Sequence, residues 1–219
     1  MKNYKDIQNA LFINLESRKD REIEVINEFK KLDIPIHRMN ATQLKNKRVA
    51  CSMSHLKCLQ TAKNNNWDHV LIVEDDIQFL NPTIFIENLN HFLSSEIKWD
   101  VLLFAGNNVP PYTKYGEYCV KVSKCQTTTG YLVLSHYYDT LIKNIKEGIA
   151  LLIKKPNDHF FNAIDKYWLS LQEKDNWFLI TPLTVIQREG FSDIENKNTN
   201  YSSLLLDLNK PHLFKNKLN

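Results

Sequence analysis

The feature that most constrains the fold is an apolar, largely β-branched run that stops at three consecutive acids. Residues 69–73 read HVLIV, and Glu74, Asp75 and Asp76 follow directly. A short segment that is apolar on both faces is typical of a central strand in a parallel sheet covered by helices. Ligands of such sheets bind beyond the carboxyl ends of the strands. The three acids therefore stand where a functional site is expected.

The rest of the chain alternates short apolar runs with amphipathic stretches. The expected strands cover residues 10–15, 35–39, 69–73, 101–104, 118–122, 131–134 and 177–180, with an extension over 182–186. The expected helices cover residues 17–32, 50–65, 83–93, 137–145 and 160–171. Residues 106–116, with two consecutive prolines, are expected to form a long irregular loop. This alternation predicts an α/β fold with helices on the sheet faces, in which the later strands are antiparallel.

Length and composition favour one domain and exclude some partners. A chain of 219 residues with 43% hydrophobic residues fits a single core, with a polar C-terminal tail over 201–219. Its 28 Lys and Arg and 25 Asp and Glu are scattered, which gives no support to nucleic-acid binding. No apolar run approaches a membrane span and the N-terminal one is too short for a signal peptide, so we expect a cytoplasmic protein. Any membrane contact would be peripheral.

The four cysteines lack the spacing of a zinc motif or of a disulfide framework. They stand at positions 51, 58, 119 and 125, with no CxxC pair among them. We expect four reduced thiols.

The acidic cluster has the chemistry of a divalent-cation site. Carboxylates are hard oxygen ligands for Mn²⁺ or Mg²⁺, and on an extended segment Glu74 and Asp76 point to the same side. A cation held there would bridge the phosphates of a nucleotide sugar and neutralise the leaving diphosphate. The competing interpretation is a solvated turn or a helix start, where acids are common.

Two further groups of polar residues follow strand or helix ends. Asn14 ends the first expected strand and is followed by Arg18 and Arg21, whose forked donors suit a diphosphate. Ser54 and His55, with Ser52, are placed near the start of the second expected helix, where free backbone N–H groups could contact a phosphate or sugar. Exposed arginines, a capping serine and a packed histidine are the alternative interpretations.

A general base is needed if a hydroxyl group attacks the sugar. Asp158 and Asp165 lie seven residues apart around a helical stretch, and either carboxylate could accept the proton. Their spacing alone does not choose between them.

Taken together, these segments resemble glycosyltransferase family 25, the lipopolysaccharide and procollagen-type β-galactosyltransferase family. The matching segments are FINLESRKDR (12–21), ACSMSHLKCLQTA (50–62), VLIVEDDI (70–77), TTTGYLVLS (127–135), AIDKYW (163–168) and PLTVIQREGFSDIE (182–195). The resemblance implies a GT-A type fold with a Rossmann-like mixed sheet over residues 1–200. It also implies a DxD-type metal motif, filled here by residues 74–76, and a UDP-sugar donor.

The resemblance implies an inverting transferase that moves galactose or a related hexose to a glycan, lipid-linked glycan or glycoprotein hydroxyl. The candidates for binding the nucleotide are Asn14, Arg18, Arg21, Ser54, His55, Glu74 and Asp75. The candidates for binding Mn²⁺ (or Mg²⁺) are Asp76, Glu74 and Gln187. The candidate for the base is Asp165, with Asp158 as the second choice. Ser192 and Asp193 follow Gln187 and are weighed with it. The alternatives are an inactive nucleotide- or glycan-binding module and a metal-dependent phosphodiesterase or nuclease.

Overall fold

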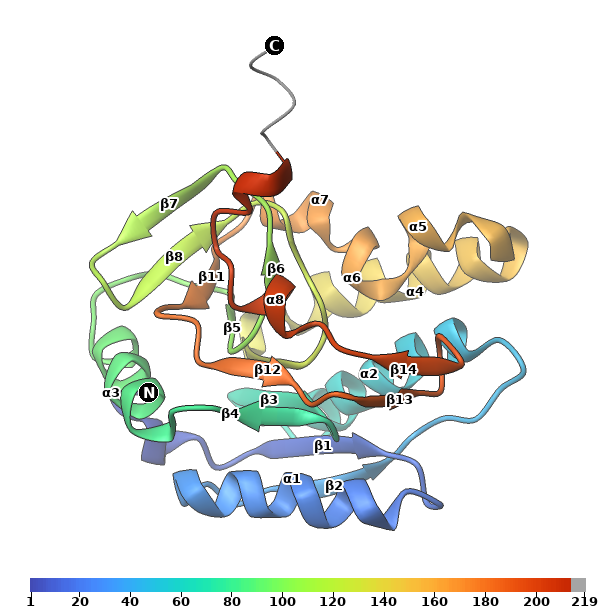
Figure 1. Cartoon of the computed structure of the whole chain (residues 1–219), viewed down its shortest axis with the longest axis horizontal. Helices are drawn as coiled ribbons and strands as arrows, with labels where there is room; N and C mark the ends of the chain where they lie inside the picture. Colours follow the sequence, from blue (N-terminus) through green and yellow to red (C-terminus); the bar gives the residue numbers. More distant parts are fainter. Residues whose placement is uncertain (214–219) are drawn as a thin grey trace.

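An eight-stranded mixed sheet runs through the computed structural model, which describes residues 1–213 (Figure 1). In spatial order its strands are β2 (His37–Asn40), β1 (Ala10–Asn14), β3 (His69–Glu74), β10 (Gly130–Leu134), β5 (Val101–Leu103), β11 (Trp177–Ile180), β8 (Cys119–Val122) and β7 (Tyr112–Tyr115). β1 is parallel to β2 and β3, and β5 is parallel to β11. β10 is antiparallel to both of its neighbours, and β8 is antiparallel to β11 and β7. The sheet is therefore mixed, with antiparallel later strands, as predicted.

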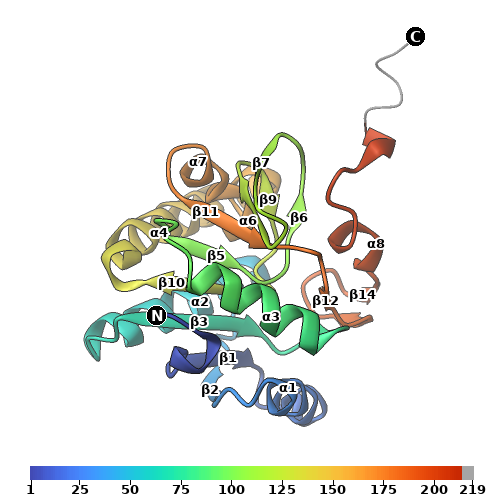
Figure 2. The same ribbon diagram turned by 90° about the vertical axis from the view of Figure 1, so that its left-hand side faces the viewer.

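Helices cover both faces of the sheet (Figure 2). They are α1 (Lys19–Leu32), α2 (Lys47–Asn64), α3 (Pro82–Leu93) and α4 (Tyr138–Lys154), followed by the short helices α5 (His159–Asn162), α6 (Ile164–Tyr167), α7 (Leu169–Gln172) and α8 (Ser202–Leu205). α1 and α3 pack on one face, and α2, α4 and α6 pack on the other. This arrangement confirms the α/β fold that the sequence predicts, a mixed sheet flanked by helices.

The central strand β3 explains why its sequence is apolar throughout. Leu71 and Val73 enter the core beneath α1 and α3, whereas Val70 and Ile72 enter the core beneath α2 and α4. Alternate side chains of a strand point to opposite faces, so a strand with helices on both sides needs apolar residues at every position. The apolar run ends at Glu74 because the sheet ends there.

Three strand pairs outside the main sheet carry connecting segments toward its carboxyl edge. They are β4 (Ile77–Phe79) with β12 (Val185–Gln187), β6 (Asn107–Asn108) with β9 (Cys125–Gln126), and β13 (Gly190–Ser192) with β14 (Lys197–Thr199). In the first pair, Gln187 lies opposite Ile77. The chain thus returns beside the acidic cluster more than a hundred residues later.

Some elements differ from those expected. The segment 106–116 contains β6 and part of its length forms β7, so it is not wholly irregular. The helix expected over 160–171 is three short helices: Ala163, with ψ of 151°, separates α5 from α6, and Trp168 separates α6 from α7. The helix expected to end at residue 145 continues to Lys154, and Gly148 and Leu152, one and two turns beyond that residue, are buried.

The segment expected to be a polar tail is packed against the protein over part of its length. Residues 201–213 include α8, which contacts β12 and β6, and Leu205 and Lys210 are buried. The apolar run Leu204 to Leu206 contributes to this contact. Because the run is short and has polar residues on both sides, the sequence did not indicate that it would be packed. The rest of the expected tail, residues 214–219, lies outside the described residues.

Two other expectations concern the cysteines and the membrane. All four cysteines are free thiols, three of them buried. Within residues 1–213, no helix combines the length and apolar character needed to cross a bilayer.

Candidate active site

A cavity of about 800 Å³ opens beyond the carboxyl ends of β1 and β3. The three acids of the 74–76 cluster line it, together with Arg18 and Arg21 from the start of α1 and Asp165 from α6. The side chains therefore come from segments up to about 150 residues apart and meet at one edge of the sheet. This is the edge at which open α/β sheets bind their ligands.

Asp75 is tied to the N-terminal part of the chain. One carboxylate oxygen accepts a hydrogen bond of 2.8 Å from the Asn14 amide, and the other accepts one of 2.8 Å from Arg21. The Asn14 amide also donates to the Arg18 carbonyl at 3.0 Å. Burial raises the pKa of Asp75, and the Arg21 guanidinium and the Asn14 amide partly offset this increase. Asp75 thus joins the ends of β1 and β3 to the start of α1.

The two arginines are engaged by acids and by a C-terminal hairpin. Arg18 forms a forked pair with Asp20 at 2.8–3.3 Å and a longer contact of 3.4 Å with Asp193. Arg21 donates to the Phe191 carbonyl at 2.9 Å. The hairpin β13–β14 therefore lies against the arginines.

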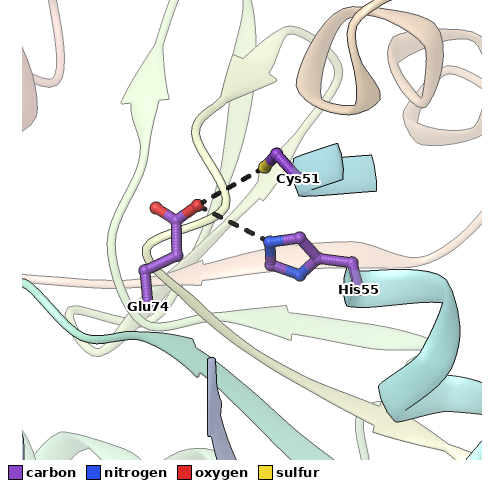
Figure 3. A group of neighbouring side chains, drawn as sticks. All are labelled: Cys51, His55 and Glu74. Carbon is purple, nitrogen blue, oxygen red and sulfur yellow. Dashed lines mark hydrogen bonds and ion pairs between the residues drawn. The ribbon is translucent and has the colours of Figure 1, made fainter. Parts of the chain in front are cut away.

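Glu74 lies between α2 and the strand β12. The Thr128 hydroxyl donates to Oε1 at 2.9 Å, and the Gln187 amide donates to Oε2 at 3.1 Å. His55 Nε2 and Cys51 Sγ lie 3.5 and 3.9 Å from Oε1, and Figure 3 shows both side chains pointing from α2 toward this carboxylate. Burial alone would raise the pKa of Glu74, but its contacts with the His55 ring and the Thr128 hydroxyl hold that pKa below its ordinary value.

Asp76 is the least satisfied of the three acids. Its Oδ2 lies 3.4 Å from Arg21, and its buried Oδ1 has no hydrogen-bond partner among the described residues. Burial and the neighbouring Glu74 carboxylate raise the pKa of Asp76 to about 7. A buried oxygen without a donor, beside a second carboxylate, is what a hard divalent cation would satisfy. The residues present therefore fit Mn²⁺ or Mg²⁺.

Glu74 and Asp76 do share one side, although not through an extended segment. β3 ends at Glu74, and Asp75 and Asp76 form a turn before β4. Gln187 bonds to Glu74 and also lowers the pKa of Asp76, so its amide lies between the two carboxylates. The predicted group Glu74, Asp76 and Gln187 is brought together.

Ser54 and His55 reach the cavity, but not from a helix start. α2 begins at Lys47, where the Asn46 side chain caps it by accepting from the Val49 N–H. Ser54 is two turns into the helix, and its hydroxyl donates to the Ala50 carbonyl and accepts from the Thr42 N–H. The free N–H groups expected here are therefore absent, because intrahelical bonds already occupy them. His55 is only 1% exposed and bonds through Nδ1 to the Tyr131 hydroxyl at 2.9 Å.

The structure separates the two candidate bases. Asp165 lines the cavity and accepts a hydrogen bond of 3.2 Å from the Thr127 N–H. Burial raises its pKa, and the Glu74 charge adds to that effect. Asp158 is not among the lining residues and lies 3.9 Å from Lys155 at the surface.

Sequence reasoning missed several residues of the cavity. Arg48 lines it and pairs with Glu195 of the hairpin at 2.8 Å, while Cys51 and Thr128 contact Glu74. Arg48 stood in the polar run KNKR, which was placed before the helix, and Thr128 stood in the run TTTG before β10. KNKR closely precedes the matching segment 50–62 and TTTG opens the matching segment 127–135, and these positions were the available signal.

Comparison with known proteins gives a family. The model of glycosyltransferase family 25, described as an LPS biosynthesis protein, matches residues 41–168. The match covers α2, the acidic cluster and Asp165, and leaves out β1, both α1 arginines and the C-terminal hairpin. No curated protein sequence matches the chain.

Similar solved structures are distant. A mutant of Drosophila β-1,4-galactosyltransferase 7 in complex with manganese, UDP-Gal and xylobiose has 15% identity and a TM-score of 0.38, over 62% of this chain and 52% of its own. A glycosyltransferase involved in glycosylation of the major capsid of PBCV-1 has 11% identity and a TM-score of 0.41, over 80% and 92%. A nucleoside-diphosphate-sugar pyrophosphorylase from Vibrio cholerae has 17% identity and a TM-score of 0.40, over 93% and 83%. This chain thus spans about half the length of the galactosyltransferase, and likeness at this level does not select a reaction.

Proposed function

The chain belongs to glycosyltransferase family 25, and we propose that it is an inverting, metal-dependent transferase that uses a UDP-sugar. The sugar, galactose or a related hexose, would pass to a hydroxyl of a glycan or glycoconjugate. The observation that carries this proposal is the buried Oδ1 of Asp76, which lacks a donor beside Glu74 in a cavity that two arginines also line. That is an arrangement for a cation and a diphosphate together.

The cation site consists of Asp76 and Glu74, with the Gln187 side chain between them. When bound, Mn²⁺ or Mg²⁺ supplies Lewis-acid stabilisation of the leaving diphosphate. The chain's own part is to hold two carboxylates at fixed positions. Thr128 and Gln187 do this for Glu74, and Arg21 limits the movement of Asp76.

The nucleotide would lie along the arginines. Arg18 and Arg21 provide forked donors for phosphate oxygens, and the buried side-chain oxygen Asn14 Oδ1 has no donor among the described residues. The contact between Arg18 and Asp193 is long, at 3.4 Å, and therefore weak, so a diphosphate could replace it. Asp75 serves this region by holding Arg21 and Asn14 in place.

Asp165 is our candidate for the base. In an inverting transfer the acceptor oxygen bonds to the anomeric carbon as the bond to the diphosphate breaks, and the acceptor proton passes to a carboxylate. Asp165 faces the cavity, and its raised pKa favours proton acceptance. Asp158 lies outside the cavity lining and is the weaker candidate.

The acceptor side includes an exposed apolar surface at the cavity rim. Phe160 lines the rim and is 70% exposed, while Phe161 and Ile153 are 75% and 64% exposed. Lys154 and Lys155 stand between them in the chain and are also exposed. Apolar side chains next to lysines suit the interface of an anionic bilayer, so we propose peripheral contact with a membrane carrying a lipid-linked acceptor. A free glycan or glycoprotein acceptor would not need this surface.

UDP binding tests the transferase proposal. UDP with Mn²⁺ should raise the melting temperature of the protein, whereas UDP or Mn²⁺ alone should do so less. Absence of any shift would contradict the proposal. Metal-dependent cleavage of DNA or RNA would favour a phosphodiesterase, and UDP binding without turnover on any acceptor would favour an inactive binding module.

A further inference from the structure

We propose that Cys51, His55 and Glu74 form a second cation site, which selects a thiophilic divalent cation, Zn²⁺, over Mn²⁺. The site is distinct from the Asp76 and Gln187 positions, although it shares Glu74 with them. It does not depend on the proposed function, because it rests only on the geometry and ligand chemistry of three side chains.

The three side chains have the spacing of a shared cation. Cys51 and His55 are four residues apart on α2, which places them on one face of the helix (Figure 3). The potential ligand atoms all lie within 4.8 Å of one another, and Glu74 Oε1 is 3.5 Å from His55 Nε2 and 3.9 Å from Cys51 Sγ. Tetrahedral Zn²⁺ with its usual bond lengths puts N, O and S ligand atoms roughly 3.3–3.6 Å apart. The His55–Glu74 distance already falls in this range, and the Cys51–Glu74 distance exceeds it by a few tenths of an ångström.

The His55 ring supplies an independent sign of a missing ligand. Its side chain is 1% exposed, and its Nε2 points at the cluster without forming a hydrogen bond to the described residues, although Glu74 Oε1 lies 3.5 Å away. Its Nδ1 is bonded to the Tyr131 hydroxyl. A histidine that binds a metal commonly uses its other nitrogen for such an outer contact, which fixes the ring orientation.

The ligand set decides which cation fits. A thiolate, an imidazole and one carboxylate form a mixed S, N and O set that suits Zn²⁺, whereas Mn²⁺ prefers oxygen ligands. Burial and the Glu74 carboxylate raise the pKa of the Cys51 thiol, so binding must release its proton to solvent as the metal–sulfur bond forms. All three residues line the cavity, which leaves a fourth position for water.

The cobalt spectrum of the full chain tests the site directly. Co²⁺ substitutes for Zn²⁺, and a thiolate ligand gives a sulfur-to-cobalt charge-transfer band in the near ultraviolet. We expect this band in the wild type and its loss on addition of Zn²⁺. Cys51→Ser should abolish the band and lower Zn²⁺ affinity by at least about 100-fold, since even outer-shell changes cost 10–100-fold.

Two control variants locate the effect. Cys58→Ala removes a buried thiol from the same helix that has no part in the cluster, and Asp76→Asn removes a neighbouring carboxylate. Both should keep the band, and circular dichroism checks that each variant is folded. Glu74→Gln should weaken Zn²⁺ binding but retain the cobalt–thiolate band at higher metal concentration.

Two results would overturn the proposal. The first is a cobalt charge-transfer band in Cys51→Ser as strong as that of the wild type. The second is the absence of this band in the wild type, together with equal Zn²⁺ uptake by the wild type and Cys51→Ser. The second result would leave the cluster as a metal-free relay, in which Tyr131 donates to His55 and His55 Nε2–H faces Glu74. Neither readout needs nucleotide or turnover, so failure of the transferase proposal would leave this test unaffected.

Discussion

The two sides of the cavity differ in how far the protein satisfies its own charged groups. On the arginine side, formed by Asn14, Arg18, Arg21 and Asp75, each charged group has an opposite charge within hydrogen-bond distance, and the atom without a donor among the described residues is the neutral Asn14 Oδ1. On the carboxylate side, formed by Cys51, His55, Glu74 and Asp76, buried atoms of His55 and Asp76 have no hydrogen-bond partner in the described part of the chain.

This difference separates structural from ligand-binding acids within one tripeptide. Buried polar groups are nearly always paired, so a closed network supports the fold and an open one indicates a ligand. Asp75 belongs to the first kind and Asp76 to the second, although they are adjacent in the sequence. Substitutions of the two acids should therefore change different properties of the protein.

Asp76→Asn should abolish metal-dependent turnover. The amide keeps the size of the side chain but is a poor ligand for a hard cation, so we expect a loss of at least about 100-fold at saturating Mn²⁺. Release of UDP from the donor measures it, and the melting temperature of the metal-free protein should not fall. Activity within a few-fold of wild type would remove Asp76 from the metal site.

Asp165→Asn should lower kcat by about 100- to 10,000-fold, the usual contribution of a general base, without weakening UDP binding. Because burial raises the pKa of Asp165, the wild-type rate should rise with pH along a limb above the ordinary carboxylate range, and the variant should lack that limb. Asp158→Asn is the matched control and should leave both the rate and its pH profile unchanged. A parallel loss of UDP affinity in Asp165→Asn would contradict the role of base.

Asp75→Asn should chiefly reduce stability. It breaks a largely buried pair with Arg21 and alters the bond to Asn14, so we expect a loss of about 3 kcal/mol in the free energy of unfolding. Urea denaturation measures this. Asp20→Asn, which removes an exposed partner of Arg18, is the control and should be nearly neutral. Equal effects of the two substitutions would show that the arginine side has no structural network at Asp75.

The metal-free protein should become less stable as pH rises, in part through Asp76. Its pKa is about 7 in the folded protein and near 3.8 when unfolded, so between these values unfolding releases a proton. Its stabilising contribution is complete below the unfolded pKa and is lost as pH rises through about 7. Urea denaturation at pH 5 and pH 8 gives the free energies of unfolding of wild type and Asp76→Asn. The stability of the variant relative to wild type should be higher at pH 8 than at pH 5. A difference independent of pH would place the Asp76 carboxyl in a less buried setting.

The rim surface should contribute a smaller and separable effect. Replacing Ile153 and Phe161, which lie outside the cavity lining, together by serine should reduce sedimentation with anionic vesicles by about tenfold, since two large apolar side chains leave the interface. Turnover with a soluble acceptor should be unchanged. Phe191→Ser, at an exposed position on the hairpin, is the control. Equal vesicle binding by all three proteins would exclude membrane contact through this surface.

Much of the fold could be predicted because apolar periodicity reports burial. The run at β3 predicted a strand with helices on both faces, and its abrupt end placed the acids at the carboxyl edge. The start of α2 was predicted three residues late, because KNKR carries no apolar spacing and the Asn46 cap has no apolar residue beside it. The break at Ala163 was missed because a backbone conformation at one alanine leaves no mark on composition.

The residues that line the cavity could be predicted better than the hydrogen bonds between them. Asp75 is the acid that is hydrogen-bonded within the protein, because Arg21 and Asn14 donate to it. These two residues are more than fifty positions away in the sequence, and residue spacing cannot reveal such contacts. The same holds for the hairpin that brings Asp193 and Glu195 to the arginines. Asp165 was preferred to Asp158 by family resemblance alone, and only the three-dimensional structure separates their positions.

The most direct test of the account is UDP release from a panel of UDP-, GDP- and CMP-sugars, with and without Mn²⁺, by wild type, Asp76→Asn and Asp75→Asn. Many transferases pass the sugar slowly to water, so an acceptor is not essential. We expect Mn²⁺-dependent UDP release from one UDP-sugar, lost in Asp76→Asn at every donor concentration and recovered by folded Asp75→Asn at saturating donor. Metal-independent release, or equal loss in both variants when folded, would contradict the separation of the two acids.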